Sequence, residues 1–212
     1  MNSEDFMIRI QSKTMNNKRL YCKATLEYVG EDQNIEEDFR GGDKLAFVDI
    51  SFDTELSEYS QSYELDNGRQ IMLSTSYHGF LHKFYNYVSQ RSLYKKFPVL
   101  QKTKGISYVL LLCCICEALK LGFTTLESEI ILEASGLIAG QSMLNLVKYY
   151  EQLGFSVIYP EYLELGLDQE YNGFVPMKAK VQRLISLCTV DRVSPEMLEL
   201  LPVRMCKGMC GL

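Results

Sequence analysis

Residues 101–122, QKTKGISYVLLLCCICEALKLG, join a basic loop to the most apolar run of the chain. That run, ISYVLLLCCICEAL at 106–119, is too short to span a bilayer and is typical of a buried helix. Lys120 falls in the expected last turn, where its charge suits the helix dipole, and Gly122 follows as a C-terminal signal. The sequence therefore predicts a buried helix over residues 105–120.

Length and composition indicate one soluble globular domain. The 212 residues can form one sizeable core, and 47% apolar with 23% charged residues is an ordinary balance. The net charge of −5 argues against nucleic-acid binding and favours a cationic substrate such as an amine. The start, MNSEDFMIRI, lacks the apolar length of a secretory signal, and the cysteines of CCIC (113–116) are expected to be small core residues. We therefore expect a cytoplasmic protein that binds neither nucleic acid nor membrane.

The N-terminal half is expected to form strands, because aromatic and β-branched residues alternate in part with polar ones. The expected strands are FMIRIQSK (6–13), LYCKATLEYV (20–29), KLAFVDISF (44–52) and RQIMLSTSY (69–77). Residues 30–42 and 55–66 are expected loops, and Asn67-Gly68 is a strong hairpin signal. At 80–97 the apolar spacing changes to that of a helix, which Pro98 would end.

The C-terminal half alternates between the two periods. The expected strands are SEIILEAS (128–135), FSVIYPEY (155–162) and NGFVPMKAKV (172–181). A helix over residues 142–153 is closed by Gly154, and a short helix begins at Ser194. This order predicts an α+β fold with helices on both faces of a central, mostly antiparallel mixed sheet. The main domain would be residues 1–190, with a helical insertion at 80–97, and residues 191–212 would form a C-terminal helix and a cysteine-containing tail.

The loop before the apolar helix has the residues of a phosphate site. A helix N-terminus offers unpaired N–H groups and partial positive charge, and Lys102 and Lys104 add to that charge. Gly105 would allow a ligand to approach the backbone closely, and the hydroxyl of Ser107 could donate a hydrogen bond. The alternative is an ordinary capped helix with two solvated lysines.

Several short motifs follow one another in the order of a known family. The segment KTKGIS (102–107) resembles the pyrophosphate-binding signature R/Q-x-x-G-x-G/A of the GNAT N-acetyltransferases, and a leucine pair follows at 110–111. ILEAS (131–135) is similar to the family's fifth strand, and YYEQLGF (149–155) to its Y-x-x-x-G-F segment. FVPMKAKV (174–181) resembles the closing strand. The resemblance covers residues 98–185 and implies the GNAT fold.

In GNAT proteins two parallel strands part and acetyl-CoA lies between them, with its pyrophosphate over the loop that begins the next helix. The resemblance therefore implies acetyl-CoA as the co-substrate and no metal. The implied cofactor-binding residues, most of them through backbone N–H groups, are Lys102, Lys104, Gly105, Ile106 and Ser107. The tyrosine that matches Tyr150 commonly protonates the departing CoA thiolate, while a core aromatic is the alternative interpretation.

The amine must lose a proton before it attacks, and Glu133 is the candidate acceptor. It shares strand parity with Glu129 and Glu127, so the three could equally belong to a solvated strand face. Ser107 stands where the family has Gly or Ala, and Met143 near a frequent Asn. The strand before the loop would be either RQIMLSTSY followed by an insertion, or a distorted VLQ (99–101).

Two histidines in HGFLH (78–82) and two tail cysteines, Cys206 and Cys210, share a spacing of four. Together they could form a metal set, but ordinary surface histidines are the expectation. The leading hypothesis is acetyl transfer to an amine of a small molecule, a peptide N-terminus or a lysine, with a homodimer as one form of assembly. The alternatives are an inactive GNAT-fold binding protein and an α+β interaction protein whose motifs match by chance.

Overall fold

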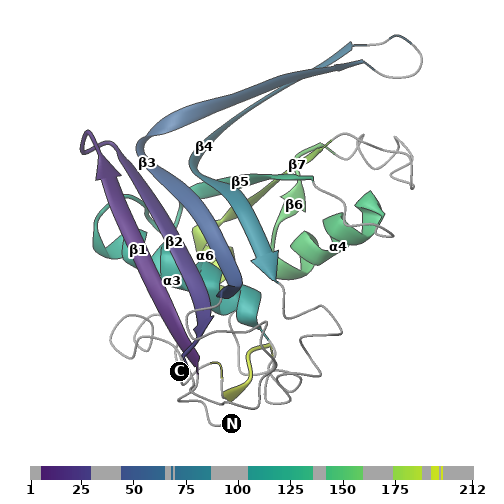
Figure 1. The fold of residues 1–212 in the computed structure, drawn as a ribbon. Coiled ribbons are helices and arrows are strands. Elements are labelled where there is room, and N and C mark those ends of the chain that lie inside the picture. The colour runs from purple at the N-terminus through teal and green to yellow at the C-terminus, as the bar shows by residue number, and fades with distance from the viewer. Residues whose placement is uncertain are drawn as a thin grey trace.

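A seven-stranded mixed sheet organises the chain (Figure 1). The computed structural model describes residues 6–29, 44–64, 68, 70–86, 105–135, 142–159, 174–187, 192–195 and 197. The strands are β1 (Phe6–Met15), β2 (Arg19–Tyr28), β3 (Lys44–Glu64), β4 (Gln70–Asn86), β5 (Glu129–Ala134), β6 (Ser156–Val157) and β7 (Val175–Lys180). The helices are α3 (Ile106–Lys120), α4 (Met143–Leu153) and α6 (Val181–Ser186). Their order confirms an α+β fold.

The sheet is mostly antiparallel, and its order is β1-β2-β3-β4-β5-β7-β6. Among the described strands, β4 and β5 alone pair in parallel, while every other neighbouring pair is antiparallel. The β4–β5 connection contains α3, and the connection from β5 to β6 contains α4. The mostly antiparallel, mixed sheet expected from the sequence is therefore confirmed.

One face of the sheet, here called the helix face, carries the apolar side chains of β2 and β3. Strand alternation brings Leu20, Cys22, Val48 and Ile50 to this face, where all four are almost fully buried. Helix α3 packs on β1, β2 and β3, and α6 packs on α3. The cysteines of α3 are buried in this layer, as expected for small core residues. Helices on the opposite face stay a prediction.

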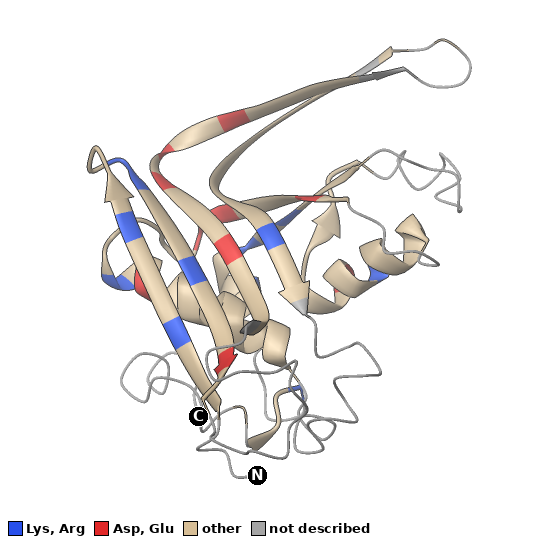
Figure 2. Ribbon diagram, viewed as in Figure 1, with Lys and Arg blue, Asp and Glu red and all other residues tan. Residues whose placement is uncertain are grey.

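The opposite face, here called the polar face, carries charged residues on adjacent strands. Lys23 of β2, Asp49 of β3 and Lys83 of β4 lie in register (Figure 2). On the same face Arg9 donates to Glu27 at 3.0 Å. A sheet with one apolar and one polar face accounts for the partial alternation in the sequence.

The helix expected at 80–97 is wrong over its described part, because residues 80–86 belong to β4. The cause is a β-bulge: Leu81 pairs with Ile50 but Lys83 pairs with Asp49, so one extra residue is inserted. The bulge brings Leu81 and Phe84 to the same face, a spacing of three that resembles a helix. Residues 87–97, and the alternative strand VLQ, lie outside the described residues.

Strand β3 also extends through most of the expected polar loop at 55–66, as far as Glu64. It pairs with β4 up to Gln70, which confirms a hairpin around Gly68 with φ of 74°. This two-stranded arm projects from the body of the sheet (Figure 1). It is attached to the body through Tyr159, whose hydroxyl donates to the Ser74 carbonyl at 3.0 Å.

The C-terminal half follows the predicted order and adds helix α6, which the sequence analysis did not predict, directly after β7. Ser142 caps α4 by accepting from the Asn145 N–H at 3.3 Å, and Gly154 ends the helix with φ of 106°. The expected strand at 155–162 is short, because β6 contains only Ser156–Val157. Val193 and Met197 are buried in the common core, so the beginning of the C-terminal segment packs against the domain.

Candidate functional site

The parallel strands β4 and β5 pair over a short length and then separate. Their ladder joins Gly79–Leu81 to Ile130–Leu132, whereas β4 continues to Asn86 and β5 to Ala134. Figure 1 shows the two strands running in different directions beyond the ladder. Gly79 permits the close approach within it, because a Cβ there would lie 3.1 Å from Ile130 Cγ1. We call the point after Leu81 and Leu132 the parting of β4 and β5.

The start of α3 is covered by the C-terminal segment. Gly105 is left-handed, with φ of 84°, and a Cβ there would lie 2.7 Å from the Arg192 carbonyl oxygen and 2.8 Å from Val193 Cγ2. The close approach that Gly105 permits in this structure is therefore to residues 192 and 193. Ile106 and Ser107 are buried in the first turn. Lys102 and Lys104 lie outside the described residues.

Ser107 and α4 are joined by a hydrogen bond at this end of α3. The Ser107 hydroxyl lies 2.5 Å from the hydroxyl of Tyr149, whose ring packs against Phe84 of β4 at 5.9 Å. Burial raises the pKa of Tyr149 above its usual range, and the bond from Ser107 opposes that rise. Tyr149 therefore links β4, α3 and α4 beside the parting.

Tyr150 is 9% exposed and lies in the core of the helix face. Its ring packs edge-on against the rings of Tyr149 and Phe155, with centroid distances of 5.5 and 6.3 Å. Burial raises the pKa of Tyr150 to about 12, so the phenol keeps its proton at neutral pH. This position suits the core aromatic of the alternative interpretation.

The three glutamates of the predicted row have different partners. Glu127 accepts from Lys180 at 3.1 Å and Glu129 from Lys178 at 3.3 Å, both from β7 or its end. Glu133 instead accepts at Oε1 from the Tyr59 hydroxyl at 2.9 Å and from Gln61 Nε2 at 3.1 Å. Both of these donors come from the β3–β4 arm, which therefore lies over Glu133.

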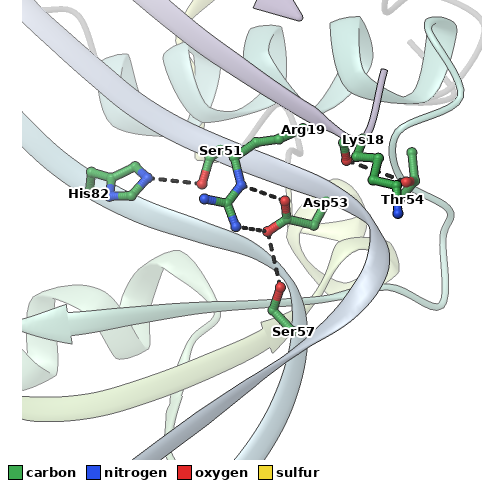
Figure 3. Close-up of polar contacts among 7 residues, drawn as sticks. All are labelled: Lys18, Arg19, Ser51, Asp53, Thr54, Ser57 and His82. Carbon is green, nitrogen blue, oxygen red and sulfur yellow. Dashed lines mark hydrogen bonds and ion pairs between the residues drawn. The ribbon is translucent and has the colours of Figure 1, made fainter. Parts of the chain in front are cut away.

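On the polar face, next to the parting, His82 lies beside Ser51 (Figure 3). The His82 Nε2 and the Ser51 hydroxyl are 2.9 Å apart, and Tyr21 stacks on the imidazole at 6.2 Å. Burial lowers the pKa of His82; the charges of Asp49 and Asp53 oppose this, and those of Arg19 and Lys83 add to it. Sequence reasoning missed this pair, since it placed His82 in the expected helix at 80–97 and expected an ordinary surface histidine.

A second polar cluster continues along the same face (Figure 3). Arg19 donates to both carboxylate oxygens of Asp53, at 2.5 and 2.9 Å, and Ser57 donates to the same carboxylate at 3.2 Å. A cavity of 360 Å³ lies beside it, with Tyr21 in its lining. The bidentate pair holds Arg19 and Asp53 in a fixed geometry.

His78 and His82 lie on a strand, and Cys206 and Cys210 lie outside the described residues. Within the described part of the chain, no three His, Cys, Asp or Glu side chains gather so that they could hold a metal ion. None of the helices in that part combines the length and apolarity needed to cross a membrane.

Comparisons of the chain with protein-family models, with curated proteins and with solved structures find no match. The GNAT resemblance therefore depends on the motifs of the sequence.

Proposed function

We propose that the chain is an N-acetyltransferase of the GNAT type, which moves an acetyl group from acetyl-CoA to an amine. The observation that supports it best is the parting of β4 and β5. Helix α3 follows the first of these strands and α4, which carries Tyr150, follows the second. Two parallel strands that part in this way are what the GNAT resemblance implies, in the order in which the motifs occur.

The parting also suits the chemistry of the cofactor. Backbone N–H and C=O groups need hydrogen-bond partners, and the β5-facing edge of β4 has no described strand beyond Leu81. The pantetheine arm of acetyl-CoA contains amides and can pair with such an edge as an added strand would. The resemblance would then place the pyrophosphate at the loop before α3, with Lys102, Lys104, Gly105, Ile106 and Ser107, where residues 192 and 193 pack on Gly105 in this structure.

In the proposed reaction the amine nitrogen attacks the acetyl carbonyl carbon, a C–N bond forms and the C–S bond breaks. Tyr150 gives its proton to the departing thiolate and regains one from the amine, so that CoA leaves as the thiol. Glu133 is the candidate that first accepts the ammonium proton. The acceptor would be a small molecule, a peptide N-terminus or a lysine, and the active form could be a homodimer.

The test is a calorimetric titration of the full chain with acetyl-CoA and, separately, with CoA. We expect binding that weakens at least tenfold, about 1.4 kcal/mol, in the double variant Lys102→Gln/Lys104→Gln. Lys120→Gln is the matched control, because Lys120 lies at the other end of α3 and is exposed. Binding that is absent in the folded wild-type protein, or that the double variant leaves unchanged, would contradict the proposal.

An inactive GNAT-fold binding protein is the second candidate. It is favoured by the burial of Tyr150 and by the packing of residues 192 and 193 on Gly105. Tyr150→Phe separates the two candidates, because it removes one hydroxyl and keeps the ring. An enzyme would lose about 10²-fold in turnover and keep its affinity for acetyl-CoA. Tyr159→Phe is the control, since its hydroxyl bonds to Ser74 of the arm.

A further inference from the structure

The bulge in β4 places His82 at the parting. Leu81 and Leu132 form the last parallel pair, and their side chains lie on the helix face with Ile50. The residues that follow them, His82 and Glu133, therefore turn to the polar face on either side of the parting. Bulges commonly redirect a side chain beside an active site, and this one occurs at the last residues before the strands separate.

The imidazole of His82 contacts protein groups on one side, and the residue as a whole is exposed to solvent. The hydroxyl of Ser51, a residue that is 3% exposed, lies 2.9 Å from Nε2 of His82. The ring centroids of Tyr21 and Phe80 lie 6.2 and 4.9 Å from the centroid of the imidazole. These contacts fix the orientation of the ring, while His82 itself remains accessible to solvent. When Nε2 donates to the Ser51 oxygen, Nδ1 carries the free lone pair.

Four charged groups surround His82: Asp49 and Asp53 from β3, Arg19 from β2 and Lys83 beside it on β4. The two carboxylates and the two cations oppose one another, so burial decides the direction, and the pKa of His82 lies below its usual value. The ring is therefore neutral at pH 7 and able to accept a proton. By contrast, Glu133 already accepts two hydrogen bonds at Oε1.

We propose that His82, in place of the sequence candidate Glu133, is the catalytic base that takes the proton of the acceptor ammonium at the parting of β4 and β5, with Ser51 as its positioning residue. This inference rests on the proposed acetyltransferase function. The ammonium loses one proton to Nδ1 of His82, and the neutral amine attacks the acetyl carbon. The C–S bond breaks, a second amine proton ends on the thiolate, and the imidazolium releases its proton to solvent.

The chain offers a direct probe, because it contains two histidines. Long-range ¹⁵N–¹H spectra of the imidazoles resolve His78 and His82, and His78→Gln assigns them. We expect the Nε2–H tautomer for His82, a pKa below that of free histidine, and shifts of its signals when acetyl-CoA is added. Ser51→Ala should change the tautomer ratio and leave acetyl-CoA affinity unaltered within twofold.

Turnover is then measured as thiol release with spermidine and with tyramine as probe amines. His82→Gln should lower kcat by about 10²-fold or more and remove the fall in rate at acid pH, with His78→Gln as the matched control. The affinity of His82→Gln for acetyl-CoA, measured by calorimetry, should equal that of the wild type. Equal affinity would show that the variant is folded.

The outcomes separate the two proposals. A folded wild-type chain that does not bind acetyl-CoA overturns the acetyltransferase function and this inference with it. Binding that leaves the His82 signals unmoved overturns the role of His82 alone, and so does an acid limb that persists in His82→Gln. If neither amine is acetylated, the response of the His82 signals to acetyl-CoA decides whether the role of His82 stands.

Discussion

The contact between Gly105 and the C-terminal segment makes a quantitative prediction for Gly105→Ala. An alanine at φ of 84° costs about 1–2 kcal/mol, because its Cβ lies close to the carbonyl oxygen of the same residue. The Cβ would also lie 2.7 Å from the Arg192 oxygen, a backbone atom, and 2.8 Å from Val193 Cγ2. Overpacking of this kind adds about 1–3 kcal/mol. The free energy of unfolding of Gly105→Ala should therefore be lower than that of the wild type by about 2–5 kcal/mol.

Gly122→Ala is the control for the backbone term. Gly122 follows the other end of α3, has φ of 75° and has nothing within 4 Å of the added Cβ. It should therefore cost about 1–2 kcal/mol from the backbone alone. The difference between the two variants, about 1–3 kcal/mol, measures the packing of residues 192 and 193 on α3.

Urea unfolding of both variants measures this difference. With an m-value of about 2 kcal/mol per molar urea, the midpoints should differ by about 0.5–1.5 M. Equal midpoints would refute the packing of the C-terminal segment on Gly105. The same contact makes Gly105→Asp a poor probe of cofactor binding, since the aspartate would displace this segment whether or not a ligand binds there.

Three further predictions follow from single contacts. Ser142→Ala removes the cap of α4 and should lower the free energy of unfolding by about 1 kcal/mol in urea; an unchanged midpoint would exclude the cap. Burial raises the pKa of the Cys114 thiol, so the native chain should resist iodoacetamide at its buried cysteines, and peptide mass spectrometry should find Cys22, Cys113, Cys114 and Cys116 labelled only after unfolding. The pKa of His82 is lowered in the folded state, so the unfolded state binds more protons near pH 6. The free energy of unfolding should therefore fall as the pH decreases from about 7.5 to 5. His82→Gln should show a shallower dependence of that free energy on pH than His78→Gln.

The elements with agreeing local signals were predictable from the sequence. In α4 a serine cap, an amphipathic spacing and a left-handed glycine all indicate the same helix, and the structure begins and ends it there. The helix predicted for residues 80–86 was wrong, because their apolar spacing fits both a helix and a bulged strand. Their apolar spacing matches a helix, but the structure produces it with a bulge, which depends on how β3 pairs with β4. Local sequence does not contain that pairing.

The candidate site was predictable only in part, for a related reason. Tyr150 and Glu133 became candidates because each lies within a motif of the sequence. The contact of Tyr149 with Ser107 joins residues 42 positions apart, and that of His82 with Ser51 joins residues 31 apart. Such pairs form when strands and helices pack, so no spacing along the chain indicates them.

The register of β7 on β5 separates the three glutamates that parity alone could not distinguish. Lys180 pairs with Glu129 and Lys178 with Ile131, so the lysine side chains reach Glu127 and Glu129 and neutralise them. The next residue of β7 on that face is Pro176, opposite Glu133, and it has no charge to offer. Glu133 therefore receives neutral donors from the arm, whereas the other two carboxylates of the row have lysine partners. In the proposed reaction a cationic amine approaching the polar face would be attracted to the Glu133 carboxylate, while Nδ1 of His82, across the parting, would accept its proton.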